Sequence, residues 1–159
     1  KNKNKESWKA MEKLYKDGRV KAIGVSNFKE HHLDDLLTDA EITPMINQVE
    51  LHPQFPQEAL RNYCTKKGIL TEAWGSLMQG QIFDKELIKE IAQKHNKTVS
   101  QIGIRWAVQN GVVTIPKSTH EQRIKDNLNV FDFELDNEDM KKIAELNTGI
   151  RIGRDPDNI

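Results

Sequence analysis

The sequence lacks several features that would place it in a class at once. Its single cysteine, Cys64, excludes an internal disulfide and favours a reducing, cytoplasmic location. No apolar run is long enough to span a membrane, and none follows the charged start as a signal peptide would. The 24 basic and 24 acidic residues cancel, and without a basic surplus we expect no nucleic-acid partner.

The length and the first residues of the chain indicate how many domains it has and whether it is part of a longer protein. The chain has 159 residues, of which 36% are apolar, and we expect a single domain over residues 1–159 with a polar tail over residues 150–159. It begins with a Lys/Asn stretch and not with Met, which is typical of a surface loop that leads into a helix. We therefore expect the sequence to be a partial product of a longer chain.

Apolar spacing predicts helices that alternate with short strands. The predicted strands are residues 20–26, 45–50, 70–74 and 112–115. The predicted helices are residues 7–16, 30–38, 57–67 and 84–95, one from Thr98 to Asn110, one capped by Ser118 or Thr119, and one between Asp136 and Gly149. Gly18 is expected just after the first helix, and Thr98 with Gln101 forms a predicted capping box.

Strands that are apolar throughout and separated by helices predict an α/β fold with a parallel sheet. The compact repeat favours a (β/α)8 barrel of the TIM type, but a closed barrel takes roughly 250 residues. We therefore predict a half barrel of about four parallel strand–helix units with extra C-terminal helices. Its two unpaired strand edges favour association.

Polar residues stand at or near the ends of the first two predicted strands. Ser26 and Asn27 can bond a planar amide of a ligand, or they can simply turn the chain into the next helix. Asn47, Gln48 and Glu50 lie in an otherwise apolar strand, and their buried side chains need partners. Those partners are either a ligand or the neighbouring backbone.

The last two strands end in further polar residues. Trp74 is either a face for stacking on an aromatic ring or a core residue. After the fourth strand, Lys117, Ser118 and Thr119 precede a predicted helix whose free N–H groups suit a phosphate, and Arg123 follows one turn later. The alternative is a capped helix with an ordinary solvated face.

Taken in order, these motifs closely resemble the aldo-keto reductase family. The runs that match are Gly24 to Phe28, Asn47 to Pro53, Ile115 to Ser118 with Arg123 beyond it, and Val130 to Leu135. The resemblance covers essentially the whole chain. It implies strands five to eight of a (β/α)8 barrel.

The resemblance also implies NADP(H) as cofactor. Residues similar to Ser26, Asn27 and Gln48 hold the nicotinamide carboxamide, and the position of Trp74 stacks on its ring. The remaining implied cofactor residues are Ser76, Leu77, Lys117, Ser118, Thr119, Arg123, Asp126 and Asn127. The family usually has Ser-Pro-Leu where this chain has Gly75-Ser76-Leu77, so the pyrophosphate contact of that loop differs.

The family's catalytic Tyr, Lys, Asp and His have no counterpart in this sequence. We interpret Tyr15 and Tyr63 as packing residues, the latter inside a helix, and we expect neither a catalytic residue nor a metal site. A carbonyl substrate would then require an N-terminal half. The alternatives are an inactive nucleotide-binding or structural half barrel that forms a homodimer through its open edges, and a truncated or proteolytic remnant of a reductase.

Overall fold

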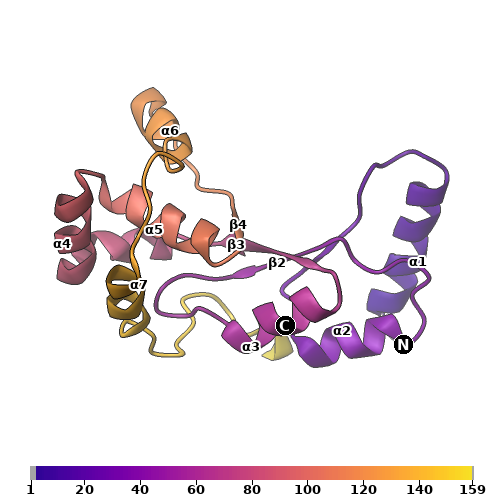
Figure 1. The fold of residues 1–159 in the computed structure, drawn as a ribbon. Coiled ribbons are helices and arrows are strands. Elements are labelled where there is room, and N and C mark those ends of the chain that lie inside the picture. Colours follow the sequence, from indigo (N-terminus) through magenta and orange to yellow (C-terminus); the bar gives the residue numbers. More distant parts are fainter. Residues whose placement is uncertain (1–2, 159) are drawn as a thin grey trace. The chain divides into compact units, whose positions relative to one another are not determined.

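The structure is a computed structural model that describes residues 3–158 (Figure 1). Its chain divides into two compact units. The first unit contains Lys1–Val49 and Glu58–Thr71, and the second contains Glu50–Gln57 and Glu72–Ile159. The expectation that the whole chain folds as a single domain stays a prediction.

The first unit contains most of the elements expected from the N-terminal sequence. They are α1 (Lys3–Lys16), β1 (Val25–Ser26), α2 (Glu30–Leu37), β2 (Ile46–Glu50), α3 (Glu58–Lys66) and the start of β3 (Leu70–Trp74). Gly18 follows α1 with a φ of +69°, and Arg19 N donates to Leu14 O over 3.0 Å. This geometry confirms the predicted end of the first helix, because a left-handed residue after a helix suits glycine.

The first strand is shorter than predicted, since residues 20–24 are not part of it. β1 pairs with β2 alone, in parallel, with Val25 opposite Asn47 and Ser26 opposite Gln48. Gly24 precedes it where a Cβ atom would lie 2.7 Å from the carbonyl oxygen of Ile46. An edge strand with one neighbour forms few ladder hydrogen bonds, which explains why the predicted run is only partly a strand.

A small core in the first unit fixes α1. Buried Trp8, Ile23 and Leu36 form its centre, and Tyr15 packs against it. Glu12 of α1 is also buried, and its Oε1 accepts the backbone N–H groups of residues 41 and 42 over 2.8 and 2.9 Å. Those two contacts stabilise a buried carboxylate that lies four residues after Trp8, on the same face of the helix.

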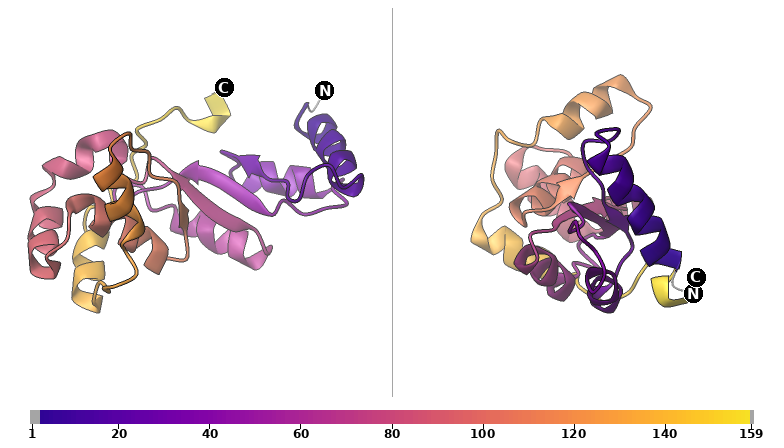
Figure 2. Two further views of the ribbon diagram at one scale, coloured as in Figure 1. Left: turned by 90° about the horizontal axis from the view of Figure 1, so that it is seen from above. Right: turned by 90° about the vertical axis from the view of Figure 1, so that its right-hand side faces the viewer.

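The second unit holds most of the helices. They are the 3-10 helix η1 (Met78–Asp84), α4 (Glu86–His95), α5 (Val99–Gln109), α6 (Glu121–Leu128), α7 (Asn137–Ala144) and the short η2 (Pro156–Asn158), with β4 (Val113–Thr114) between α5 and α6. Helix α4 packs on α5 and α7, and α6 follows a long non-helical segment (Figures 1 and 2). Over residues 3–158, no helix has both the length and the apolar content needed to cross a bilayer.

The four strands form one parallel sheet in the order β1-β2-β3-β4. Backbone hydrogen bonds join β2 and β3 near both ends, from Leu70 N to Met45 O and from Leu51 N to Trp74 O. β4 pairs with β3 through Val113 and Thr114 only, so the predicted strand over 112–115 is too long. The α/β half-barrel prediction is confirmed, and the residues after each strand follow the carboxyl edge of the sheet.

Helix caps test the sequence signals directly. Thr98 and Gln101 form the predicted capping box at α5, and Asp136 with Asp139 forms another at α7. At α6 the prediction is wrong, because the N-cap residue is His120 and its side chain forms no capping hydrogen bond. Ser118 Oγ instead accepts the N–H of His120 over 3.1 Å, so the hydroxyl stabilises a local turn before the helix.

Charged side chains join α4 to α7. Lys94 Nζ lies 2.6 Å from Asp136 Oδ2 and 2.9 Å from Asp139 Oδ1, and His95 Nε2 lies 2.6 Å from the other oxygen of Asp139. The hydrogen bond from Lys94 lowers the pKa of Asp136 from 3.8 to about 2. Since the ionised form is the one stabilised by folding, Asp136 contributes stability above its unfolded pKa.

We expect Asp136→Asn to lower the free energy of unfolding at pH 6, because asparagine keeps the cap and loses the charge. The difference from the unsubstituted chain should narrow as the pH falls from about 4 towards 2, where Asp136 becomes protonated in both states. Urea unfolding followed by circular dichroism at several pH values measures it. In a Lys94→Met background this pH dependence should shrink, and a difference that stays constant with pH would contradict the assignment.

Candidate functional site

A polar cavity of about 540 Å³ lies beyond the carboxyl ends of β3 and β4 in the second unit. The loop after β3 forms one wall, and the segment after β4 with one side of α6 forms the other. It is lined by Gly75, Ser76, Leu77, Gln79, Gly80, Phe83, Ser100, Ile115, Pro116, Lys117, Ser118, Thr119, His120, Arg123 and Asn127.

Two permanent cations line the polar cavity, and no carboxylate does among the described residues. Lys117 lies on the segment after β4, and Arg123 lies in the first turn of α6. Both residues are exposed, and neither has an ion-pair partner within residues 3–158. The cavity therefore presents positive charge that no acidic side chain neutralises, which favours an anionic ligand.

Neutral donors surround these charges. Ser118, Thr119 and Asn127 line the same cavity, and α6 begins beside them with backbone N–H groups that no side chain caps. Asp126 does not line the cavity, and its Oδ1 accepts a hydrogen bond from Gln122 Nε2 over 2.8 Å. The predicted cofactor residues after β4 are thus brought together around the cavity except for Asp126.

The loop after β3 has an unusual backbone. Gly75, Met78, Gln79 and Gly80 all have φ between +52° and +99°. A left-handed conformation costs non-glycine residues about 1–2 kcal/mol each, so packing must hold the loop. Met78 supplies that packing, since its side chain is fully buried and its N–H donates to Gly75 O over 2.7 Å. The loop places Ser76 and Leu77 in the cavity wall.

Close packing against α5 also fixes this loop. A Cβ atom at Gly103 would lie 2.6 Å from Ile82 Cδ1 and 3.3 Å from Leu77 Cδ2. The glycine therefore allows η1 and the loop before it to approach the helix closely. Leu77 and Ser76 are held by this contact, although the Ser-Pro-Leu run typical of the family is absent.

Trp74 is the last residue of β3 and is half-buried. Its ring is neither a fully buried core residue nor a fully exposed face for stacking. It does not line the polar cavity. Gly153 of the C-terminal tail lies beside its ring, where a Cβ atom would be 2.5 Å from Trp74 Cη2. The position of the ring therefore depends on the tail.

The other predicted residues lie in the first unit at the ends of β1 and β2. Ser26 Oγ donates to Gln48 O over 3.0 Å, and Asn27 N donates to the same oxygen over 2.8 Å. Asn27 is left-handed, with a φ of +59°. Buried Asn47 bonds the backbone N–H and carbonyl of Phe28, so the backbone is the partner that its burial required.

Sequence reasoning missed part of the cavity wall. Gln79, Phe83, Ser100 and His120 line it and were not predicted. Gln79 and Phe83 belong to η1, which has neither a regular apolar period nor a cap and was therefore not recognised as a helix. Ser100 comes from the first turn of α5, whose capping box was recognised without its bearing on the site.

The two tyrosines that were interpreted as packing residues both have partners in the first unit. Tyr15 packs on the core of the first unit, and Tyr63 of α3 donates its hydroxyl to Asp34. Burial and this hydrogen bond raise the pKa of Tyr63 to about 12. A phenol that is bonded to a neighbouring carboxylate and releases its proton reluctantly suits packing better than acid catalysis.

The comparisons with known proteins identify the family. The Aldo/keto reductase family matches residues 1–148, and the chain belongs to that family. Glyoxal reductase from Bacillus subtilis is 58% identical over 159 residues, which are 100% of this chain and 58% of that protein. Methylglyoxal reductase DkgA from Escherichia coli is 46% identical over 154 residues, which are 96% of this chain and 56% of that protein.

Solved structures show the same relationship. A variant of Gox0644 in complex with NADPH superposes with a TM-score of 0.94 at 45% identity, covering 98% of this chain and 58% of that one. MGS-M4, an aldo-keto reductase from a Medee basin deep-sea metagenome library, gives 0.92 at 49% identity, covering 96% and 58%. The chain thus spans a little over half the length of the relatives it matches.

Proposed function

We propose that this chain is the cofactor-binding half of an NADP(H)-dependent aldo-keto reductase, an oxidoreductase that converts aldehydes or ketones to alcohols. The observation that carries the proposal is the polar cavity, with Lys117 and Arg123 in its wall and no carboxylate among the described residues. The Gox0644 complex with NADPH and the relatives named glyoxal and methylglyoxal reductase support it.

The residues present fit the 2′-phosphate end of the cofactor. The guanidinium of Arg123 and the ammonium of Lys117 offer charge-assisted hydrogen bonds to a phosphate, and Ser118, Thr119 and the first N–H groups of α6 add neutral donors. Asn127, with Asp126 one residue before it, would contact the adenine. A cofactor without the 2′-phosphate would leave the cations without a partner, which favours NADP(H) over NAD(H).

The remaining residues would orient the other end of the cofactor. Ser76 and Leu77 would contact the pyrophosphate, the Trp74 ring would face the nicotinamide, and Ser26, Asn27 and Gln48 would hold its carboxamide. The bound cofactor supplies a hydride to the carbonyl carbon. This chain binds and orients, and the proton for the carbonyl oxygen comes from residues that it does not contain.

Replacing Lys117 or Arg123 with alanine should weaken NADPH binding, because each removes a charged contact to the 2′-phosphate. We expect the dissociation constant to rise about 10- to 100-fold for either variant, with a smaller effect on NADH. A fluorescence titration of the purified chain measures both. Lys125→Ala is the matched control, since Lys125 lies on the same helix and pairs with Glu121 outside the cavity. Equal losses in all three variants would contradict the proposal.

The chain alone should show no measurable reduction of methylglyoxal. A positioned general acid contributes about 10²- to 10⁴-fold to such a step, and the proposal assigns that role to none of the described residues. NADPH absorbance at saturating aldehyde measures turnover, with intact Bacillus subtilis glyoxal reductase as the positive control. Addition of a separately produced N-terminal half of an aldo-keto reductase should restore activity. Robust turnover by the chain alone would refute the proposed division of the site.

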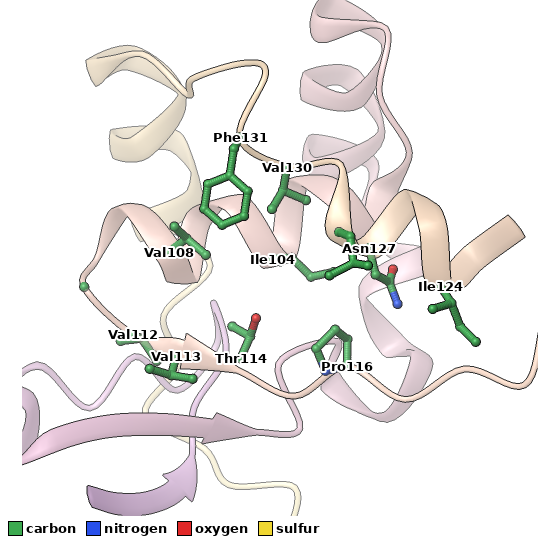
Figure 3. Close-up of a pocket in the computed structure, with 12 residues that line it drawn as sticks. Ile104, Val108, Val112, Val113, Thr114, Pro116, Ile124, Asn127, Val130 and Phe131 are labelled. Carbon is green, nitrogen blue, oxygen red and sulfur yellow. The ribbon is translucent and has the colours of Figure 1, made fainter. Parts of the chain in front are cut away.

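A second candidate function is a catalytically inactive half barrel that self-associates into a homodimer, and an apolar cavity of about 510 Å³ favours it. The cavity lies between α5, β4, α6 and the segment after α6, and Figure 3 shows Val108, Phe131 and Ile124 around it. β4 is an edge strand, and Phe131 and Leu128 are each 72% exposed. A second copy offers a parallel edge strand, β1, that can extend the sheet beyond β4.

If a second copy covers this face, association should depend on concentration and on its apolar residues. Sedimentation velocity should then show a dimer that Phe131→Asp and Leu128→Asp weaken. Ile150→Asp is the control, because Ile150 is similarly exposed, at 67%, but lies on the tail. A monomer at every concentration would contradict self-association and favour the first proposal, in which the rest of a reductase covers the edge.

A further inference from the structure

We propose that residues Thr148–Gly153 form a strap that fixes the Trp74 ring for stacking on the nicotinamide, with Glu50 as its anchor. The inference rests on the proposed function, since it assigns the nicotinamide end of the same cofactor to Trp74. It makes Glu50 and Gly153 positioning residues, which act through Trp74 and do not touch the cofactor. All of these residues belong to the second unit.

The buried carboxylate of Glu50 holds one end of the strap. Glu50 is the last residue of β2 and is 0% exposed. Its Oε1 accepts the backbone N–H of Ile152, and its Oε2 accepts that of Gly153 over 3.1 Å. The guanidinium of Arg151 lies 3.7 Å from Oε2. A carboxylate that is removed from water is destabilising unless several donors surround it. The contacts with the strap therefore stabilise the buried Glu50, and they hold the strap in place at the same time.

His52 also contacts the carboxylate that anchors the strap. Its ring is fully buried, and Nε2 lies 3.1 Å from Glu50 Oε1. Burial lowers the pKa of His52, against the opposing effect of Glu50. A neutral ring facing a carboxylate oxygen carries its proton on Nε2, which leaves Nδ1 as an acceptor without a hydrogen-bond partner in the described part of the chain. His52 therefore helps to hold the Glu50 carboxylate in the orientation in which it bonds the strap.

The other end of the strap is fixed by backbone hydrogen bonds. The N–H groups of Thr148 and Gly149 both donate to Gln54 O, over 3.0 and 3.2 Å. Between the two attachments, the Arg151 guanidinium stacks over the Phe55 ring at 4.6 Å from its centroid. The segment that follows β2 thus holds the strap from Thr148 to Arg151, and Glu50 holds the rest.

Gly153 is the residue of the strap that contacts the Trp74 ring. A Cβ atom at Gly153 would lie 2.5 Å from Trp74 Cη2, 3.4 Å from Cζ2 and 3.0 Å from Glu50 Oε2. Only a glycine leaves room for the backbone to lie between the indole edge and the carboxylate. An indole in contact with fixed backbone has fewer rotamers to lose on binding, so a stacking partner binds it at a smaller entropic cost.

The test compares two ligands in the full chain. NADPH contains the nicotinamide, and adenosine 2′,5′-bisphosphate contains only the adenine and 2′-phosphate end. Gly153→Ala and Glu50→Gln should raise the dissociation constant of NADPH about two- to tenfold, the range expected for loss of one aromatic contact. Binding of the bisphosphate should not change. Arg154→Lys, at the next position, is the control and should leave both constants unchanged.

A double-mutant cycle separates positioning from a general loss of structure. In a Trp74→Ala background, Gly153→Ala should have no further effect on NADPH, because the ring that it displaces is absent. An unchanged NADPH constant in the strap variants, equal loss of both ligands, or a full effect without Trp74 would overturn the strap. If circular dichroism shows that Glu50→Gln does not fold, Gly153→Ala alone decides the test. Binding of neither ligand by the unsubstituted chain would instead refute the proposed function, and the strap with it.

Discussion

Parallel pairing of four short strands is the constraint on which the rest of this structure depends. Because every strand runs in the same direction, the residues just after each one lie along a single edge of the sheet. The loop at Gly75 and the segment at Lys117 therefore follow neighbouring strands, β3 and β4, and line the same cavity of the second unit. Sites built in this way depend on the loops at the carboxyl ends of the strands, and the strands themselves can remain short and apolar.

The second constraint is the accommodation of buried polar groups. Glu12, Asn47 and Glu50 are all buried, and each bonds backbone groups that secondary structure leaves without partners. A buried carboxylate or amide is costly unless it is hydrogen-bonded, so each of these residues holds a particular loop in one conformation. In the second unit the tail that Glu50 bonds lies beside the half-buried Trp74, and the polar cavity holds two cations with no carboxylate among the described residues that line it.

Local signals in the sequence predicted the features that local interactions determine. The Thr98–Gln101 capping box and the left-handed Gly18 involve neighbours within a few residues, and both were predicted correctly. The ends of β1 and β4 were not, because strand length depends on how many neighbours an edge strand has. His120 replaced Ser118 as the cap of α6 because the hydroxyl bonds a turn. The cavity around Lys117 and Arg123 was predicted through resemblance, whereas Glu12 and the tail contact of Glu50 involve partners about 30 and 100 residues away.

The distance in sequence between Glu50 and its partners also bears on how the chain is made. Ile152 is 102 residues downstream of Glu50, so a growing polypeptide on the ribosome carries this carboxylate long before its donors exist. The end of β2 must therefore remain hydrated, or borrow other partners, until the segment around Ile152 has left the exit tunnel. Its final surroundings form only at that point, because a nascent chain that ends before Ile152 contains the whole of β2 but neither of these backbone donors to Glu50.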